Sequence, residues 1–180
     1  MLDTEYNDKA RREATEAAIT HCAMLNLKNK AKNTLLVIVN MREPSYRKRL
    51  YVYDMASKTH IRNHHCSHGT SSSDPRNKSL AVRFSNTPNS HMTSLGAMMT
   101  EDVYYGRHGR SLRLIGLEKG KNDNVYRRDI VIHSASYVTD KYIRVTGRCG
   151  CSFGCFAVDP AISNSLIDLI KEGTLLYCYY

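Results

Sequence analysis

Short apolar runs separated by turn-forming segments limit what this chain can fold into more than any other feature. The runs are rich in Val, Ile, Leu and Tyr, and they are too short to form typical helices, so they favour β-strands. The polar segment 67–75 holds Gly, Ser, Asp and Pro, which favour turns. The runs lie at 35–39, 50–53, 112–114, 130–132 and 175–180. We therefore expect a mainly β domain.

Three segments predict helices around this β domain. Residues 5–26 are rich in Ala, Glu, Arg and Lys with apolar residues near helical spacing, which indicates an amphipathic helix packed on the domain. A second helix is predicted over 139–145. A third begins with Asp159 as N-cap and Pro160 at its first position, continues to Lys171 and ends at Gly173.

Together these strands and helices predict a single domain. We expect two mixed sheets in a β-sandwich or flattened barrel, with the N-terminal helix and C-terminal helices outside. Residues 1–33 are expected to be a helical extension packed on a main domain over 34–180.

The formal net charge of +9 favours anionic partners such as nucleic acid, acidic glycopolymers or membrane surfaces. A basic surface without a specific partner accounts for the charge equally well. No apolar run approaches the roughly 18 residues of a membrane span. The first residues lack the apolar segment of a secretory signal peptide. A cytosolic protein, a mature chain and another export route all fit this start.

The cysteines are even in number but unevenly placed, because three lie between residues 149 and 155. This spacing is unlike the disulfide framework of a small secreted domain. It favours reactive or metal-binding thiols, with incidental thiols as the alternative. The six are Cys22, Cys66, Cys149, Cys151, Cys155 and Cys178.

One group of residues, a histidine at a strand end and a cysteine after a Gly-rich turn, is a candidate catalytic site. The strand at 130–132 ends in His133, and a Gly-rich turn presents Cys155 just before another apolar strand. A free thiol with a pKa of about 8.5 is mostly protonated at neutral pH, and a nearby imidazole can take its proton. Amides around Gly154 and Cys155 are candidates for an oxyanion hole. From these residues alone, a hydrogen-bonded core histidine and an inert cysteine stay the simpler interpretation.

Ordered blocks across 34–180 add to this interpretation. They lie at 48–54, 68–69, 84–91, 94–96, 104–106, 108–109, 111–114, 116–118, 122–124, 130–133 and 152–155. In these blocks the chain resembles the murein L,D-transpeptidase catalytic-domain family of the YkuD-like type, specifically its second branch.

The resemblance implies a cysteine acyltransferase with no cofactor. Cys155 would attack the L-centre carbonyl of diaminopimelate in a peptidoglycan tetrapeptide stem and expel D-alanine, with His133 as base and then acid. The amine of a second stem would resolve the thioester into a 3-3 crosslink. Water would give L,D-carboxypeptidase activity instead, and a D-amino acid or a lipoprotein lysine are other acceptors.

The resemblance also implies supporting residues. Ser152 would shape the turn, and Gly154 would supply an oxyanion amide. His68 is expected at the edge of the substrate groove. Structural roles at strand edges and turns are an equal alternative for the further substrate-binding candidates, which are His91, Tyr105, His108, Arg113 and Arg148. Two departures put substrate contacts in doubt, because Cys151 and Phe156 stand where the family commonly has Arg and Pro.

Two clusters raise zinc as an alternative. Residues 60–68 hold four histidines and a cysteine within one short segment, but alternate side chains of a strand face opposite ways. Cys149, Cys151 and Cys155 with His133 lack the usual zinc spacing. We therefore expect no metal.

The expected partner is the peptidoglycan stem peptide, with no nucleic acid and no membrane span, and we expect a monomer. The resemblance implies the periplasm or export to the cell envelope. A secreted effector of the same chemistry stays open, as does a basic binding module that keeps the fold without catalysis.

Overall fold

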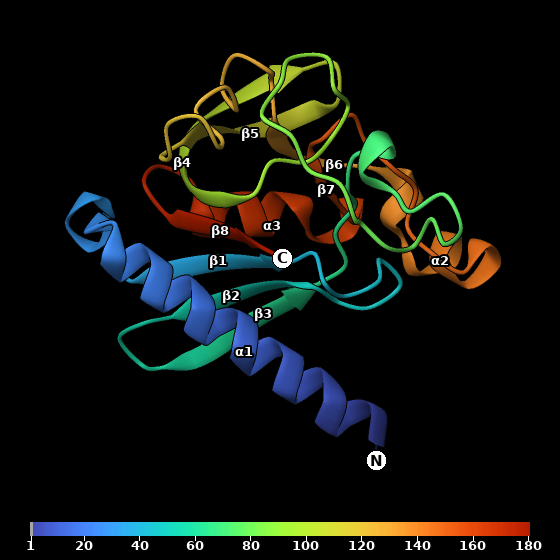
Figure 1. Ribbon diagram of the computed structural model, residues 1–180, viewed down its shortest axis with the longest axis horizontal. Helices are drawn as coiled ribbons and strands as arrows, with labels where there is room; N and C mark the ends of the chain where they lie inside the picture. The colour runs from blue at the N-terminus through green and yellow to red at the C-terminus, as the bar shows by residue number, and fades with distance from the viewer. Residues whose placement is uncertain (1) are drawn as a thin grey trace.

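The computed structural model describes residues 2–180, with side chains described from Asn7 onward. Eight strands form a single mixed sheet in the order β3-β2-β1-β8-β4-β5-β6-β7, flanked by helices (Figure 1). The strands are β1 (Leu35–Asn40), β2 (Leu50–Asp54), β3 (Thr59–His64), β4 (Gly96–Gly106), β5 (Gly109–Gly116), β6 (Val131–Ser134), β7 (Phe156–Val158) and β8 (Leu175–Tyr179). The helices are α1 (Leu2–Met24), α2 (Asp140–Thr146), α3 (Pro160–Ile170) and the 3-10 turns η1 (Leu27–Lys30), η2 (Thr70–Ser72) and η3 (Ser136–Val138).

The mainly β fold with flanking helices is confirmed, but its strands form one continuous sheet and not two. The long strand β4 is the reason. Its first residues, Gly96–Met99, pair with β8, and residues 98–106 pair with β5. The pairing with β5 shifts between Thr100 and Val103, and such an irregularity bends a strand and increases its twist. Therefore β4 joins the two halves that the sequence suggested were separate sheets.

Helix α1 packs on one face of the sheet, across β1, β2 and β3 in Figure 1. Ala14, Ala18 and Cys22 contact a buried cluster that includes Leu36 and Ile38 of β1. Small side chains on this face of the helix allow its backbone to approach the sheet closely. This packing explains why a helix of low apolarity is held on the domain.

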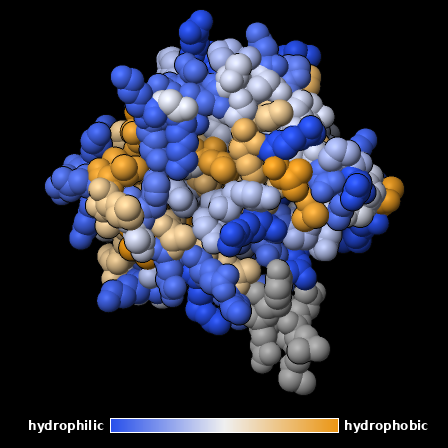
Figure 2. Space-filling model, in the orientation of Figure 1, coloured by the Kyte–Doolittle hydropathy of each residue, from blue (hydrophilic) through white to orange (hydrophobic). Residues whose placement is uncertain are grey.

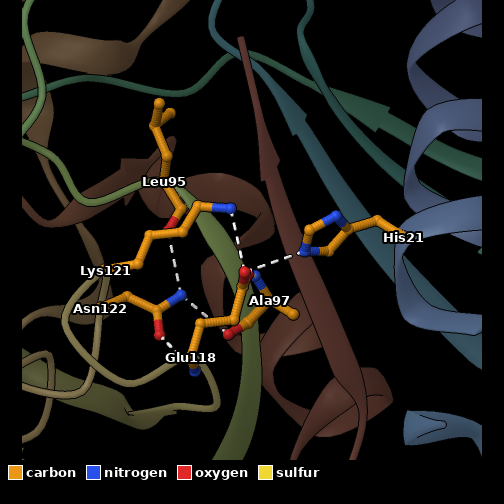
Figure 3. A network of polar contacts seen from close by, with 6 residues as sticks. All are labelled: His21, Leu95, Ala97, Glu118, Lys121 and Asn122. Carbon is orange, nitrogen blue, oxygen red and sulfur yellow. Dashed lines mark hydrogen bonds and ion pairs between the residues drawn. The ribbon is translucent and has the colours of Figure 1, made fainter. Parts of the chain in front are cut away.

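A polar network also anchors α1 (Figure 3). The carboxylate of Glu118 accepts from the Ala97 amide at 2.6 Å and from Lys121 at 3.0 Å, and His21 Nε2 lies 3.0 Å from it. Asn122 donates to the carbonyls of Leu95 and Ala97 from the same loop. The network therefore ties the helix to the loop after β5 and to the start of β4.

Helix α3 covers the other face of the sheet and helps to form the main core. Its Leu166, Ile167 and Ile170 are buried in one cluster with Leu112 and Ile132 of the sheet. The predicted start is confirmed, because Asp159 accepts from the Ala161 amide and Pro160 occupies the first turn. The predicted end differs slightly. The helix stops at Ile170, and Glu172 takes the first left-handed conformation before Gly173.

Figure 2 shows the same face of the molecule as mostly hydrophilic, with apolar residues in separate small groups. Within the described residues, no helix is both long and apolar enough to cross a membrane.

Candidate active site

His133 lies at the end of the sheet where β6 is paired with β5 and β7. Its neighbours across the ladders are Ser111 and Ala157. The ring is 1% exposed, and Nδ1 donates to the Ser134 carbonyl at 2.9 Å. Because a carbonyl only accepts, Nδ1 carries the proton and Nε2 is left as the basic nitrogen.

The environment keeps this imidazole neutral. Burial lowers the pKa of His133, and the positive charge of His108 lowers it further, against an opposing contribution from the Ser134 carbonyl. The two rings are stacked with centroids 4.2 Å apart. A neutral imidazole with a free Nε2 is the form that a general base requires.

The turn before Cys155 is built by Ser152 and Gly154. The Ser152 hydroxyl donates to the Cys155 carbonyl at 2.7 Å and accepts from the Gly154 amide at 3.1 Å. Gly154 has φ of 117°, and a Cβ there would lie 2.7 Å from the carbonyl oxygen of Met92. Only glycine fits this conformation and this space. The turn therefore fixes Cys155 at the start of β7.

The oxyanion role expected of Gly154 is corrected by this geometry, because its amide is already bonded to Ser152. The backbone amides of Val131 and of Cys155 itself both act to lower the pKa of the Cys155 thiol.

The Cys155 thiol rests against a carbonyl. Its Sγ donates to the Asp129 carbonyl at 3.4 Å, and Asp129 holds that carbonyl in place from a left-handed conformation with φ of 51°. Burial raises the pKa of the Cys155 thiol, and the charge of Asp129 raises it further. Among the described residues no hydrogen bond joins Cys155 to His133. The resting state is therefore a protonated thiol and not a thiolate–imidazolium pair.

Both predicted catalytic residues nevertheless line one cavity of about 210 Å³. His108, which the sequence also predicted, lines it as well, together with Ser152. Cys151, which the sequence marked as one of three clustered thiols, lines it too. Residues that sequence reasoning missed complete the wall, and they are Arg107, Tyr137 and Phe153. Their only sequence signal is that each lies within four positions of a predicted site residue.

Arg113 lies close to the carbonyl that holds the thiol. Its guanidinium is 3.5 Å from the Asp129 carboxylate and stacks over the rings of Tyr104 and Tyr126. Tyr104 belongs to the same neighbourhood, since burial raises its pKa and the charges of Asp129 and Cys155 act on it. Tyr104 was not predicted. Tyr105, which was predicted, is 80% exposed and lies outside this cavity. Because successive side chains of a strand point to opposite faces of the sheet, only one of Tyr104 and Tyr105 can point toward the site.

His91 stacks on Phe153 of the nucleophile turn, with ring centroids 4.1 Å apart. Its loop also carries Met92, whose carbonyl approaches Gly154. His91 thus contacts the turn and is exposed beside the cavity.

The expectation for His68 is wrong, because this residue is fully buried and does not lie at a groove edge. Its ring bonds Nη2 of the buried Arg49 at 2.7 Å and the Ser73 hydroxyl at 3.0 Å. Arg148 lies in a second cavity of about 500 Å³, which shares Cys151 with the first. Arg148 is therefore next to the Cys155 cavity and does not line it.

Neither zinc alternative gains support. Within the part of the chain that is described, no group of three or more His, Cys, Asp or Glu side chains is placed to hold a metal ion. All six cysteines are free thiols.

The mixed sheet thus presents a buried imidazole and a turn-mounted cysteine to one cavity. The sequence model described as the L,D-transpeptidase catalytic domain matches residues 6–179. The chain belongs to this family, as its sequence blocks predicted.

The chain is also similar to solved structures at low sequence identity. An L,D-transpeptidase from Mycobacterium smegmatis is 13% identical, with a TM-score of 0.48 over 82% of this chain and 59% of that one. The helical cell shape determining protein Pgp2 from Campylobacter jejuni is 13% identical, with a TM-score of 0.50 over 87% and 52%. The chain thus spans between half and two thirds of these proteins. No curated protein sequence matches it.

Proposed function

We propose that this protein is a cysteine acyltransferase of peptidoglycan, an L,D-transpeptidase acting on tetrapeptide stems. The observation that carries the proposal is that the Cys155 thiol and the neutral His133 imidazole line the same cavity. Family membership supports the substrate class. Because this substrate lies in the cell wall, the proposed location is the bacterial envelope.

The reaction begins when the thiol leaves the Asp129 carbonyl. The S–H proton moves to Nε2 of His133, and the thiolate attacks the L-centre carbonyl of the stem peptide. Burial holds His133 neutral, so the ring is ready to accept the proton. The Cys155 amide, one of the two amides expected from the sequence, would donate to the developing oxyanion.

The intermediate then collapses. The C–N bond to D-alanine breaks, His133 returns its proton to the leaving amine, and Cys155 carries a thioester. An amine of a second stem attacks the thioester carbonyl, breaks the C–S bond and gives a 3-3 crosslink. Water in the place of that amine gives the L,D-carboxypeptidase product.

Cations around the site suit a substrate with free carboxylates. Arg107 lines the cavity, and Arg148 lies in the adjoining one. Arg113 lies behind the thiol at Asp129, so its role is to position that segment. Arginine binds carboxylates in a bidentate manner, which lysine does not match.

Product analysis tests the proposal. The protein and a Cys155→Ala variant are incubated with disaccharide-tetrapeptide muropeptides, and Cys22→Ala, remote from the cavity, is the matched control. We expect loss of D-alanine or a 3-3 dimer with the wild type and the control only. Unchanged muropeptide with a folded wild-type protein contradicts the proposal.

A specific observation favours a second candidate, a non-catalytic module that binds an anionic wall polymer. The pKa of the Cys155 thiol is raised and not lowered, and the net charge is +9. Such a module would bind an anionic column in a strongly salt-dependent way, and its Cys155 would react with iodoacetamide no faster than an ordinary thiol.

A further inference from the structure

A series of hydrogen-bonded polar side chains leads to Cys151, and the proposed reaction does not use it. This series starts at Arg49, which is fully buried, and within the described part of the structure its guanidinium contacts two carbonyls and a histidine and no carboxylate. Its Nε and Nη1 donate to the carbonyls of Cys66 and Glu43, and Nη2 contacts Nδ1 of His68 at 2.7 Å. Burial of a cation is costly because the charge loses its hydration, and hydrogen bonds from the guanidinium offset part of this cost.

The direction of each hydrogen bond follows from the donors available. A guanidinium only donates, so Nδ1 of His68 is the acceptor and Nε2 carries the ring proton. Nε2 therefore donates to the Ser73 hydroxyl at 3.0 Å. Burial and the nearby Arg49 lower the pKa of His68 to about 3, which agrees with a neutral ring.

The Ser73 hydroxyl, which accepts from His68, also forms a hydrogen bond with Cys151 Sγ, 3.4 Å away, and it donates in that bond when Cys151 is a thiolate. Nη1 of Arg148 reaches the same sulfur at 3.7 Å. Cys151 Sγ thus contacts a hydroxyl and a guanidinium, and the guanidinium is a cation. Cys149 offers the contrast: it is fully buried, its thiol donates to the Ser45 carbonyl, and burial raises its pKa to about 11.

Cys151 also lies close to Cys155 in the sequence, with three residues between them. The two thiol-bearing residues line the same cavity, and the turn between them is closed by the bond from the Ser152 hydroxyl to the Cys155 carbonyl. Both residues are partly exposed, so a small oxidant has access to them.

We propose that Cys151 is a peroxide-reactive thiol, and that its oxidation joins it to Cys155 in a reversible disulfide. The thiolate of Cys151 attacks a peroxide oxygen and breaks the O–O bond. The sulfur is oxidised by two electrons to a sulfenic acid, and the other peroxide oxygen leaves as water after taking a proton. The Cys155 thiolate then attacks the Cys151 sulfur, its proton passing to His133. The S–O bond breaks, and hydroxide takes up that proton and leaves as water.

The consequence for catalysis rests on the proposed function. A nucleophile held in a disulfide is inactive, but it is protected from irreversible oxidation and is restored by a dithiol reductant. The thiol chemistry itself is measured by mass and needs no activity, so its failure is distinguishable from failure of the transpeptidase proposal.

The disulfide is tested by mass spectrometry after a limiting dose of hydrogen peroxide. Free thiols are alkylated without reduction, and the tryptic peptide over 149–171 is sequenced, since it holds all three clustered cysteines. We expect a loss of two hydrogens with alkylation only at Cys149. The disulfide is expected to persist in the matched control Cys149→Ala. A bond that includes Cys149, or none at all, overturns the proposal.

The order of events is tested by trapping sulfenic acid with dimedone. The Cys155→Ala variant is expected to be labelled at Cys151, and the Cys151→Ala variant at least tenfold more slowly at Cys155. Equal labelling of the two variants contradicts the assignment of Cys151 as the first thiol to react.

The role of the hydrogen-bonded side chains is tested by removing each polar contact of Cys151 in turn. Ser73→Ala is expected to slow dimedone labelling in the Cys155→Ala background by about tenfold, because the thiolate loses one hydrogen bond. Arg148→Gln, on a partly exposed residue, is expected to slow labelling as well, and Arg148→Lys to restore part of it. Unchanged rates in Ser73→Ala and Arg148→Gln, with the wild-type fold confirmed by circular dichroism, overturn the role of these donors.

Discussion

The imidazole of His108 lies stacked on that of His133, with ring centroids 4.2 Å apart and an angle of 19° between the planes. Two rings at this distance share one electrostatic environment, so a proton on one disfavours a proton on the other. His108 belongs to the β4–β5 turn, whereas His133 ends β6. The sheet therefore brings a second imidazole to the base from a different hairpin.

This stacking predicts the acid side of the activity profile. His133 acts as a base only when neutral, so activity falls as the pH drops through its pKa, which burial and His108 keep below the ordinary value. In His108→Gln the charge of His108 is lost and the His133 pKa rises. We expect the acid limb of kcat/KM against pH to move to higher pH, with the alkaline limb in place. An acid limb that stays where it is contradicts the coupling of the two rings.

The Asp129 carboxylate is predicted to restrain the nucleophile. Its charge raises the pKa of Cys155, so Asp129→Asn, which tolerates the same left-handed backbone, is expected to lower that pKa. The alkylation rate of Cys155 by iodoacetamide at neutral pH should therefore increase. The exposed Asp102→Asn is the control and should leave the rate unchanged. A slower reaction in Asp129→Asn would show that the charge has another role.

Gly154 is predicted to be intolerant of any side chain. Alanine there would combine a disfavoured φ of 117° with a Cβ 2.7 Å from a backbone oxygen. We expect Gly154→Ala to lose about 3 kcal/mol of unfolding free energy, and to lose activity because the turn moves. Gly109→Ala is the matched control, since Gly109 also has a positive φ of 74° but meets no atom within 4 Å. It should lose about 1 kcal/mol, as measured by urea denaturation. Equal losses would argue against the close contact.

Glu118 is predicted to make the anchoring of α1 depend on pH. Burial raises its pKa, but the bonds from the Ala97 amide, Lys121 and His21 outweigh burial and leave the pKa below 4.5. A carboxylate with a lowered folded pKa contributes stability above its unfolded pKa, and this stability is lost as the pH falls through the folded value. We expect Glu118→Gln to be about 1–2 kcal/mol less stable at pH 7, with the difference from wild type shrinking below about pH 4. Glu16→Gln, on an exposed helix position, is the control. A difference that does not change with pH would rule out the charge as its cause.

The sequence predicted those elements whose local signals agree with their final surroundings. Helix α3 has an N-cap, a first-turn proline and an apolar face, and it forms where these features indicate. Strands β3 and β4 were not predicted, because β3 is polar and β4 begins with Gly, Ala and Met, so both depend on pairing with neighbours and not on their own propensity.

The residues of the candidate site also divide into those that local sequence predicted and those that it did not. His133 and Cys155 stand in short, ordered sequence blocks, and the fold brings both to one cavity. The burial of His68 and the exposure of Tyr105 depend on which side of a loop or strand faces the core. The series of hydrogen-bonded side chains from Arg49 to Cys151 joins residues 102 positions apart in the sequence, and no local sequence pattern indicates it.

The most direct test of the central claim is the intact mass of the protein during reaction with a tetrapeptide muropeptide. We expect a transient adduct equal to the muropeptide minus D-alanine, located on Cys155 by peptide mapping and absent from the Cys155→Ala variant. In a His133→Ala variant the adduct should form far more slowly, because no base takes the thiol proton. A folded wild-type protein that releases D-alanine without an adduct on Cys155, or an adduct on another residue, would contradict the assignment of Cys155 as the nucleophile.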